Sequence, residues 1–89
     1  MAIGIRAKLP GVTQEQFEGM DQAIGRDVPD GLIFHASGPI EGGWGIIDFW
    51  ESREQFDKFI AAKVAPVMAE AGAAPPGIVE FPVHEFLKS

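Results

Sequence analysis

The chemistry that this chain can perform rests on few side chains. It has two histidines, His35 and His84, and no cysteine. A neutral imidazole near pH 7 can accept or donate a proton, which is what an enzyme without a cofactor needs. Without a thiolate, and with no helical spacing of two ligands, the two histidines are too few for a metal site. The sequence therefore predicts acid–base chemistry with no metal and no other cofactor.

Asp48 is the third residue with chemical potential, because it interrupts the apolar segment Trp44–Trp50. In a strand it shares one face with both tryptophans. A carboxylate in such surroundings needs a charged or hydrogen-bonding partner. Two interpretations stay open. Asp48 is a general base or orients His84 for proton transfer, or it makes a structural contact with the backbone or with Arg6 on the neighbouring first strand.

Aromatic side chains are available to hold a flat ligand. The predicted substrate-binding residues are Trp50, Phe34, Phe81 and the second candidate imidazole, His35. The alternative is that these side chains only pack in the core or in an interface, since aromatic residues dominate both. Buried histidines, likewise, are usually just hydrogen-bonded.

The elements that position these residues follow from periodicity and turn signals. Strands are expected at 2–8, 32–37, 44–50 and 78–87, with Gly38–Gly43 as a glycine-rich loop between the middle two. Thr13 begins one helix that ends at Gly25, and Ser52 begins another that ends at Gly72. Pro66 should kink or cut the second helix. The β-α-β-β-α-β order predicts a ferredoxin-like α+β fold with a four-stranded antiparallel sheet.

The segment Trp44–Trp50 also predicts the assembly. It carries large apolar residues on both faces, and the two helices can cover only one face of the sheet. A chain of 89 residues has no further element to cover the other face. We therefore expect a homodimer in which two sheets stack face to face.

Length, net charge and hydrophobicity limit the number of domains, the binding partners and the cellular location that we expect. A chain of 89 residues makes one domain, 1–89, and its net charge of −6 disfavours nucleic acid and anionic membrane surfaces. No basic flank precedes an apolar N-terminal run, and no apolar run approaches the roughly 20 residues that span a bilayer. We expect a cytoplasmic protein with no membrane partner.

Two segments resemble a known family. Asp48-Phe49-Trp50-Glu51-Ser52, followed by the helix that opens with 53–59, resembles the dimeric α+β barrel superfamily, which includes the antibiotic-biosynthesis-monooxygenase-like proteins. The closing strand 81–86 is similar to the last strand of small members. The resemblance implies a homodimeric barrel, with a pocket between sheet and helices in each protomer. The haem-degrading branch of the family relies on an Asn, which this chain lacks.

Two functions from different classes remain. The first is a cofactor-independent monooxygenase-like or cyclase/isomerase-like enzyme acting on an aromatic or polyketide-like molecule, with His84 and Asp48 as catalytic residues. Oxygenation is implied by the resemblance alone, and acid–base cyclisation or isomerisation fits the residues equally well. The second is a non-catalytic homodimer, ligand-binding or stress-associated, whose histidines are structural. His84 and Asp48 in a closed cavity would favour the enzyme, and the same residues in a dimer seam would favour the binding protein.

Overall fold

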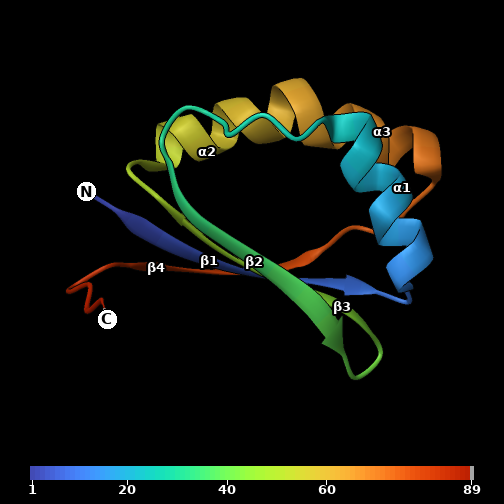
Figure 1. Ribbon diagram of the computed structural model, residues 1–89, viewed down its shortest axis with the longest axis horizontal. Coiled ribbons are helices and arrows are strands. Elements are labelled where there is room, and N and C mark those ends of the chain that lie inside the picture. The colour runs from blue at the N-terminus through green and yellow to red at the C-terminus, as the bar shows by residue number, and fades with distance from the viewer. Residues whose placement is uncertain (89) are drawn as a thin grey trace.

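The computed structural model describes residues 1–88, which form two layers (Figure 1). One layer is a four-stranded antiparallel sheet with the order β2-β3-β1-β4. Its strands are β1 (Ile3–Pro10), β2 (Leu32–Ile40), β3 (Gly43–Trp50) and β4 (Gly77–Pro82). The other layer contains α1 (Gln14–Ile24), α2 (Arg53–Phe59), the π-helical segment η1 (Ile60–Val64) and α3 (Ala65–Ala71). The predicted α+β ferredoxin-like fold is confirmed.

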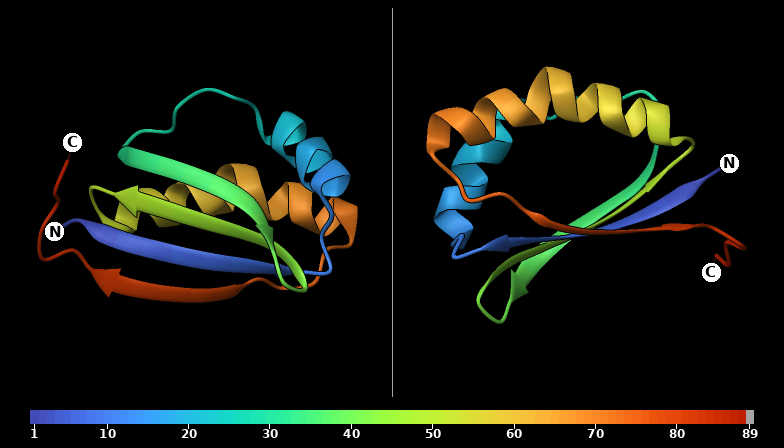
Figure 2. Two further views of the ribbon diagram at one scale, coloured as in Figure 1. Left: turned by 60° about the horizontal axis from the view of Figure 1, so that its bottom comes forward. Right: turned by 180° about the vertical axis from the view of Figure 1, so that it is seen from behind.

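The helices cover one face of the sheet and leave the other face bare (Figure 2). Because side chains alternate along each strand, this asymmetry divides the residues of the sheet into a helix-facing set and an uncovered set. No helix within residues 1–88 is long and apolar enough to cross a membrane.

Both helix starts form as predicted. The Thr13 hydroxyl accepts a hydrogen bond from the backbone N–H of Gln16, and the Gln16 side chain accepts one from the backbone N–H of Thr13. This capping box satisfies two of the free N–H groups at the start of α1. Ser52 caps α2 through the backbone N–H of Gln55. Gly25, with φ of 100°, ends α1.

Pro66 interrupts the second helix as predicted. It has no N–H to donate, and its ring crowds the carbonyl of Ala62, four residues earlier. The chain widens into the π-helical turn η1 directly before it, and the N–H of Ala65 bonds to the carbonyl of Ile60. The wider turn keeps α2, η1 and α3 in one continuous helical path.

Two predicted boundaries are wrong. The residues Gly38–Ile40 belong to β2, so the expected six-residue loop is a two-residue turn at Glu41 and Gly42. Gly42 supplies the positive φ, 79°, that this tight turn requires. Strand β4 ends at Pro82 instead of continuing to Leu87, because Pro82 pairs with Ile3, the first residue of the partner strand β1, and the last bond of the ladder runs from the N–H of Val83 to the carbonyl of Ala2.

The core lies between the sheet and the helices. Trp50 is its centre, with 1% of its surface exposed, and its ring packs edge-on against Phe56 and at a tilt against Phe59. The other buried side chains come from β1, β3 and α1: Ile3, Ile5, Leu9, Met20 and Trp44. Trp44 stacks on Phe17 and so holds α1 over the N-terminal end of β3.

Candidate functional site

His35 and Asp48 are the one histidine–carboxylate pair in direct contact among residues 1–88, and we call them the His35–Asp48 dyad. The two residues are direct partners on the neighbouring strands β2 and β3. His35 Nδ1 lies 2.5 Å from Asp48 Oδ1. The other carboxylate oxygen accepts a hydrogen bond of 3.4 Å from Trp50 Nε1. Because Trp50 is buried in the core, this contact connects the dyad to the core.

The dyad lies on the helix-facing side of the sheet. Its side chains differ in exposure, at 13% for Asp48 and 40% for His35. The hydrogen bond to Asp48 raises the pKa of His35, partial burial opposes that rise, and the negative charge of Asp48 adds to it. The charges of Asp21 and Arg26 have smaller and opposite effects. These two residues form a 3.4 Å ion pair at the end of α1.

This geometry fixes what His35 can do. An ionised carboxylate accepts hydrogen bonds and cannot donate them, so Nδ1 carries the proton in the contact with Asp48. In the neutral imidazole Nε2 is then the basic nitrogen. A carboxylate that orients a histidine and stabilises its charged form is the arrangement that supports general acid–base catalysis.

Sequence reasoning picked both members of the dyad but not their pairing. Asp48 was expected to orient His84 or to pair with Arg6, and its carboxylate contacts His35 instead. Arg6 pairs with Ile47, one position away from Asp48, so its side chain is on the opposite face of the sheet. His84 is an exposed residue beyond the end of β4. Its catalytic role therefore stays a prediction without a structural partner.

The predicted aromatic residues separate onto two faces. Trp50 adjoins the dyad, but Phe34 and Phe81 lie on the uncovered face and cannot line a pocket beneath the helices. The position of Phe34 follows from the register shift between Leu32 and Phe34, because this shift turns Leu32 toward the helices and Phe34 away from them. Phe81 pairs with Gly4, and its ring lies over that glycine on the uncovered face.

Phe34 and Phe81 belong to a surface cluster. Both lie beside Phe49, at centroid distances of 6.4 and 6.3 Å, and Phe86 meets the same ring at 5.7 Å. We call these four residues the aromatic cluster. Except for Phe49, each is about half exposed. A partly exposed aromatic surface of this kind is typical of a protein interface.

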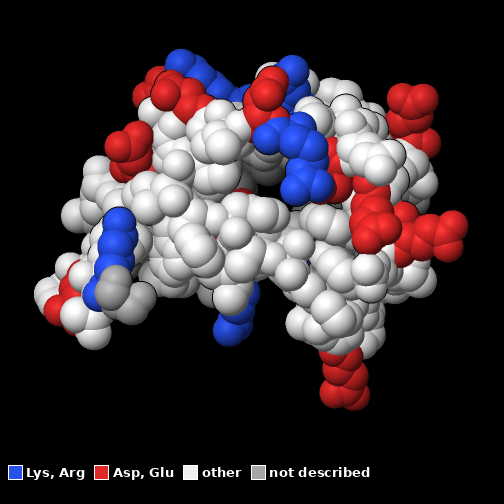
Figure 3. Space-filling view, viewed as in Figure 1, with Lys and Arg blue, Asp and Glu red and all other residues white. Residues whose placement is uncertain are grey.

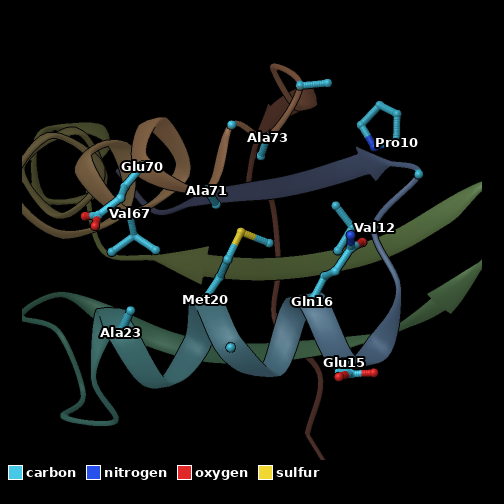
Figure 4. A pocket seen from close by; sticks show the side chains of 14 residues that line it. Pro10, Val12, Glu15, Gln16, Met20, Ala23, Val67, Glu70, Ala71 and Ala73 are labelled. Carbon is cyan, nitrogen blue, oxygen red and sulfur yellow. The ribbon is translucent and has the colours of Figure 1, made fainter.

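Two grooves lie away from the dyad. The first, of about 580 Å³, runs between α1 and α3, and Figure 4 shows Met20 and Val67 reaching into it from the two helices. The second, of about 530 Å³, lies on the uncovered face and includes Arg6 and Lys8. Neither groove is lined by His35 or Asp48. Within residues 1–88, no group of three or more His, Cys, Asp or Glu could hold a metal ion.

Charged side chains are distributed unevenly around these features. Figure 3 shows acidic and basic groups gathered over the helical layer, while the surface across the middle of the molecule is mostly uncharged. The i,i+4 pairs Arg53–Asp57 and Glu54–Lys58 account for part of this arrangement. Arg53 also contacts Glu80 and so connects α2 to the edge strand β4.

No protein-family model and no curated protein matches the sequence. Solved structures do match its fold. Rv0793 from Mycobacterium tuberculosis superposes with a TM-score of 0.76 at 12% identity, over 99% of this chain and 100% of that one. A variant of SnoaB, a cofactor-independent oxygenase from Streptomyces nogalater, superposes with a TM-score of 0.64 at 13% identity, over 99% of this chain and 97% of that one.

A variant of MhuD with two manganese protoporphyrin IX molecules bound per active site gives a TM-score of 0.65 at 18% identity, over the full length of both chains. At these identities the likeness concerns the fold. The chain therefore has a ferredoxin-like α+β fold that it shares with solved structures, among them two described as putative antibiotic biosynthesis monooxygenases.

Proposed function

We propose that this protein is a small cofactor-independent enzyme that moves a proton on an aromatic or polyketide-like molecule, with His35 as the proton-transfer group and Asp48 as the residue that orients it. The observation that carries the proposal is the 2.5 Å contact between the two side chains. It occurs on the helix-facing side of a fold that is also found in a cofactor-independent oxygenase.

The chemistry needs a substrate with an acidic O–H or C–H group, such as a phenol or an enol. His35 Nε2 would accept that proton, and Asp48 would stabilise the imidazolium that forms. The electron-rich anion left behind can react with molecular oxygen, which is oxygenation, or be protonated at another position, which is isomerisation. In a substrate with a carbonyl group within reach, the anion can instead attack that carbonyl carbon, whose oxygen then takes the proton, and this is cyclisation.

The proposed enzyme is a homodimer that assembles through the uncovered face of the sheet. The aromatic cluster supplies the apolar surface for this contact, because Phe34, Phe81 and Phe86 are only half buried in the single chain. A pair of such faces would bury the rings of both protomers, as obligate dimers do.

The test compares wild type with His35→Gln and His84→Gln. Each variant would be mixed with a panel of hydroxylated aromatic compounds while oxygen uptake and product formation are followed. We expect turnover of at least one compound to fall about 100-fold or more in His35→Gln, which is the usual contribution of a general base. His84→Gln serves as the matched control and should stay within about twofold of wild type. Equal activity in wild type and His35→Gln would contradict the proposal.

A non-catalytic ligand-binding protein is the second candidate. The groove between α1 and α3 favours it, since this groove has apolar walls from Met20 and Val67 and lies apart from both histidines. In that case ligands would bind with unchanged affinity in His35→Gln, and no compound of the panel would be converted.

A further inference from the structure

The helix-facing side of the sheet is well covered at its two ends and less covered between them. Along β1, Ile5 and Leu9 are 2% and 5% exposed, whereas Ala7 between them is only partly buried. All three face the helices, because side chains two residues apart lie on one face of a strand. The partners of Ala7 across the sheet are likewise exposed or partly buried, and together they form what we call the middle row: Ser37, Ile46, Ala7 and Ile78.

The buried side chains divide accordingly into two groups. One cluster surrounds Trp50 and Phe56, with side chains of α2 and η1 packed against it. Leu9, Met20 and Trp44 are also buried but lie outside this cluster. Met20 is the only buried side chain of α1. The helix α1 therefore packs on its own end of the sheet, and its movement would leave the main core intact.

Glycines connect α1 to the rest of the chain. Gly11 and Gly25 flank it, with positive φ angles of 72° and 100°. Residues at the ends of an element can absorb the backbone rotation of a hinge, and glycine does so with the least steric restriction. On the side of α3, the groove of about 580 Å³ lies between the two helices, and small side chains form much of its lining, among them Ala23, Ala71 and Ala73 (Figure 4). Hinges at both ends and loose packing against α3 give α1 room to move.

The contact that holds α1 on the sheet also hides a polar group. Phe17 stacks on Trp44 at a centroid distance of 5.2 Å. Trp44 is 7% exposed, and its Nε1 is the one buried side-chain nitrogen or oxygen within residues 1–88 without a hydrogen-bond partner there. A buried donor without a partner is unfavourable. An acceptor that reaches the indole would therefore favour a position of α1 in which Phe17 has moved away.

The strand β3 places this donor in line with the candidate site. Trp44 and Asp48 lie on the same face of β3, with Ile46 of the middle row between them. Four residues of an extended strand span about 13 Å. A molecule whose hydroxyl group contacts His35 and whose body crosses Ile46 would thus place its far end near Trp44.

We propose that α1 is a lid over the middle row and that Trp44 determines which substrates bind there. Rotation about the flanking glycines separates Phe17 from Trp44, the substrate lies over Ile46, and Trp44 Nε1 donates a hydrogen bond to a carbonyl oxygen at its far end. This inference rests on the proposed proton transfer at the dyad. It adds the class of substrate, which is an elongated aromatic molecule with an acidic hydroxyl at one end and a ketone or quinone oxygen at the other.

The first test uses two probes of similar shape, 4-acetyl-4′-hydroxybiphenyl and 4-ethyl-4′-hydroxybiphenyl, of which only the acetyl probe has a carbonyl oxygen. Trp44→Phe removes the N–H and keeps a ring on which Phe17 can stack. By calorimetry, we expect the Kd of the acetyl probe to rise about tenfold in Trp44→Phe, as for one lost hydrogen bond, and that of the ethyl probe to change less than about twofold. Ile46→Ala removes apolar contact area and should weaken both probes.

A lock on α1 tests the lid. The chain has no cysteine, so Ala23→Cys combined with Val67→Cys places two unique thiols in the groove, one on α1 and one on α3. A short bismaleimide then links the two helices. In stopped-flow tryptophan fluorescence, we expect the linked protein to bind the acetyl probe at least about tenfold more slowly than the same variant capped with N-ethylmaleimide.

Four results would overturn the proposal: an equal loss for both probes in Trp44→Phe, no loss for either, an unchanged binding rate in the linked protein, or no binding of the acetyl probe to wild type. The absorbance of the bound phenol separates this inference from the proton transfer. A probe that stays neutral in wild type but loses affinity selectively in Trp44→Phe supports the lid and Trp44 and contradicts the dyad. A probe that ionises in wild type without a selective loss in Trp44→Phe contradicts the role of Trp44 alone.

Discussion

Replacing Asp48 by Asn tests the electrostatic basis of the candidate site. The amide has nearly the same shape as the carboxylate, and its single oxygen can still accept the hydrogen bond from His35, while its NH2 group takes the place of the oxygen that accepts from Trp50. It lacks the negative charge that favours a protonated imidazole. The substitution therefore removes the charge of the dyad while it leaves the packing of β2 against β3 intact.

The loss of stability in Asp48→Asn can be estimated from the His35–Asp48 hydrogen bond and from the exposure of His35. A hydrogen bond to a charged group contributes about 1.5–3 kcal/mol to stability. His35 is 40% exposed, so solvent screening reduces this, and we expect a loss of about 1 kcal/mol in the free energy of unfolding. For a domain of this size such a loss lowers Tm by roughly 4–8 °C.

The loss should depend on pH in a defined direction. The pKa of His35 is raised in the folded protein, chiefly by its hydrogen bond to Asp48. Its stabilisation is complete below the unfolded pKa of about 6.5 and disappears as the pH rises through the folded pKa. Wild type and Asp48→Asn should therefore differ most near pH 5.5 and least near pH 9.

Urea unfolding followed by tryptophan fluorescence gives the stability at both pH values, and NMR titration of the imidazole signals gives the pKa directly. The pKa of His35 should fall in Asp48→Asn. Glu41→Gln removes a carboxylate from the hairpin turn and is the control. An unchanged pKa of His35 in Asp48→Asn, or an equal stability loss at pH 5.5 and pH 9, would refute the reasoning.

Three further variants, one of them a double substitution, test the fold and the assembly. Gly42→Ala forces a left-handed conformation on a residue with a Cβ atom and should lower the urea-unfolding free energy by about 1–2 kcal/mol; no change would contradict the turn geometry. Phe56→Ala removes the ring beside Trp50 and should cost about 3–5 kcal/mol, enough to leave much of the chain unfolded in circular dichroism at 25 °C, whereas a cooperative transition near the wild-type Tm would speak against this core. Phe34→Ser combined with Phe81→Ser should raise the dimer dissociation constant measured by sedimentation without unfolding the protomer, and an unaffected dimer would exclude the aromatic cluster as the interface.

The element order could be predicted because helix caps and strand alternation are local signals. Thr13 and Gln16 specify the start of α1 by themselves, and Pro66 specifies the interruption of the second helix. The end of β4 was predicted too late, because the apolar residues beyond Pro82 continue a strand-like pattern, whereas the strand ends where its partner β1 begins at Ile3.

The pairing within the candidate site depended on the hairpin turn. Interpreted as a six-residue loop, Gly38–Gly43 gives no register between the two strands. Recognised as a two-residue turn at Glu41 and Gly42, the same segment pairs Ile40 with Gly43, and counting back along the strands pairs His35 with Asp48. The register shift near Phe34 had no comparable signal, so the face of that ring could not be derived from alternation.

The most direct test of the central claim is the ionisation state of a bound phenol. 2-Naphthol and its anion absorb at different wavelengths, so a spectrum at pH 7.5 reports whether the bound molecule has lost its proton. If the His35–Asp48 dyad accepts that proton, the naphtholate band should appear on binding to wild type and to His84→Gln, and should be absent with His35→Gln. Naphthol that stays neutral when bound to wild type, or a naphtholate band that persists in His35→Gln, would contradict the account.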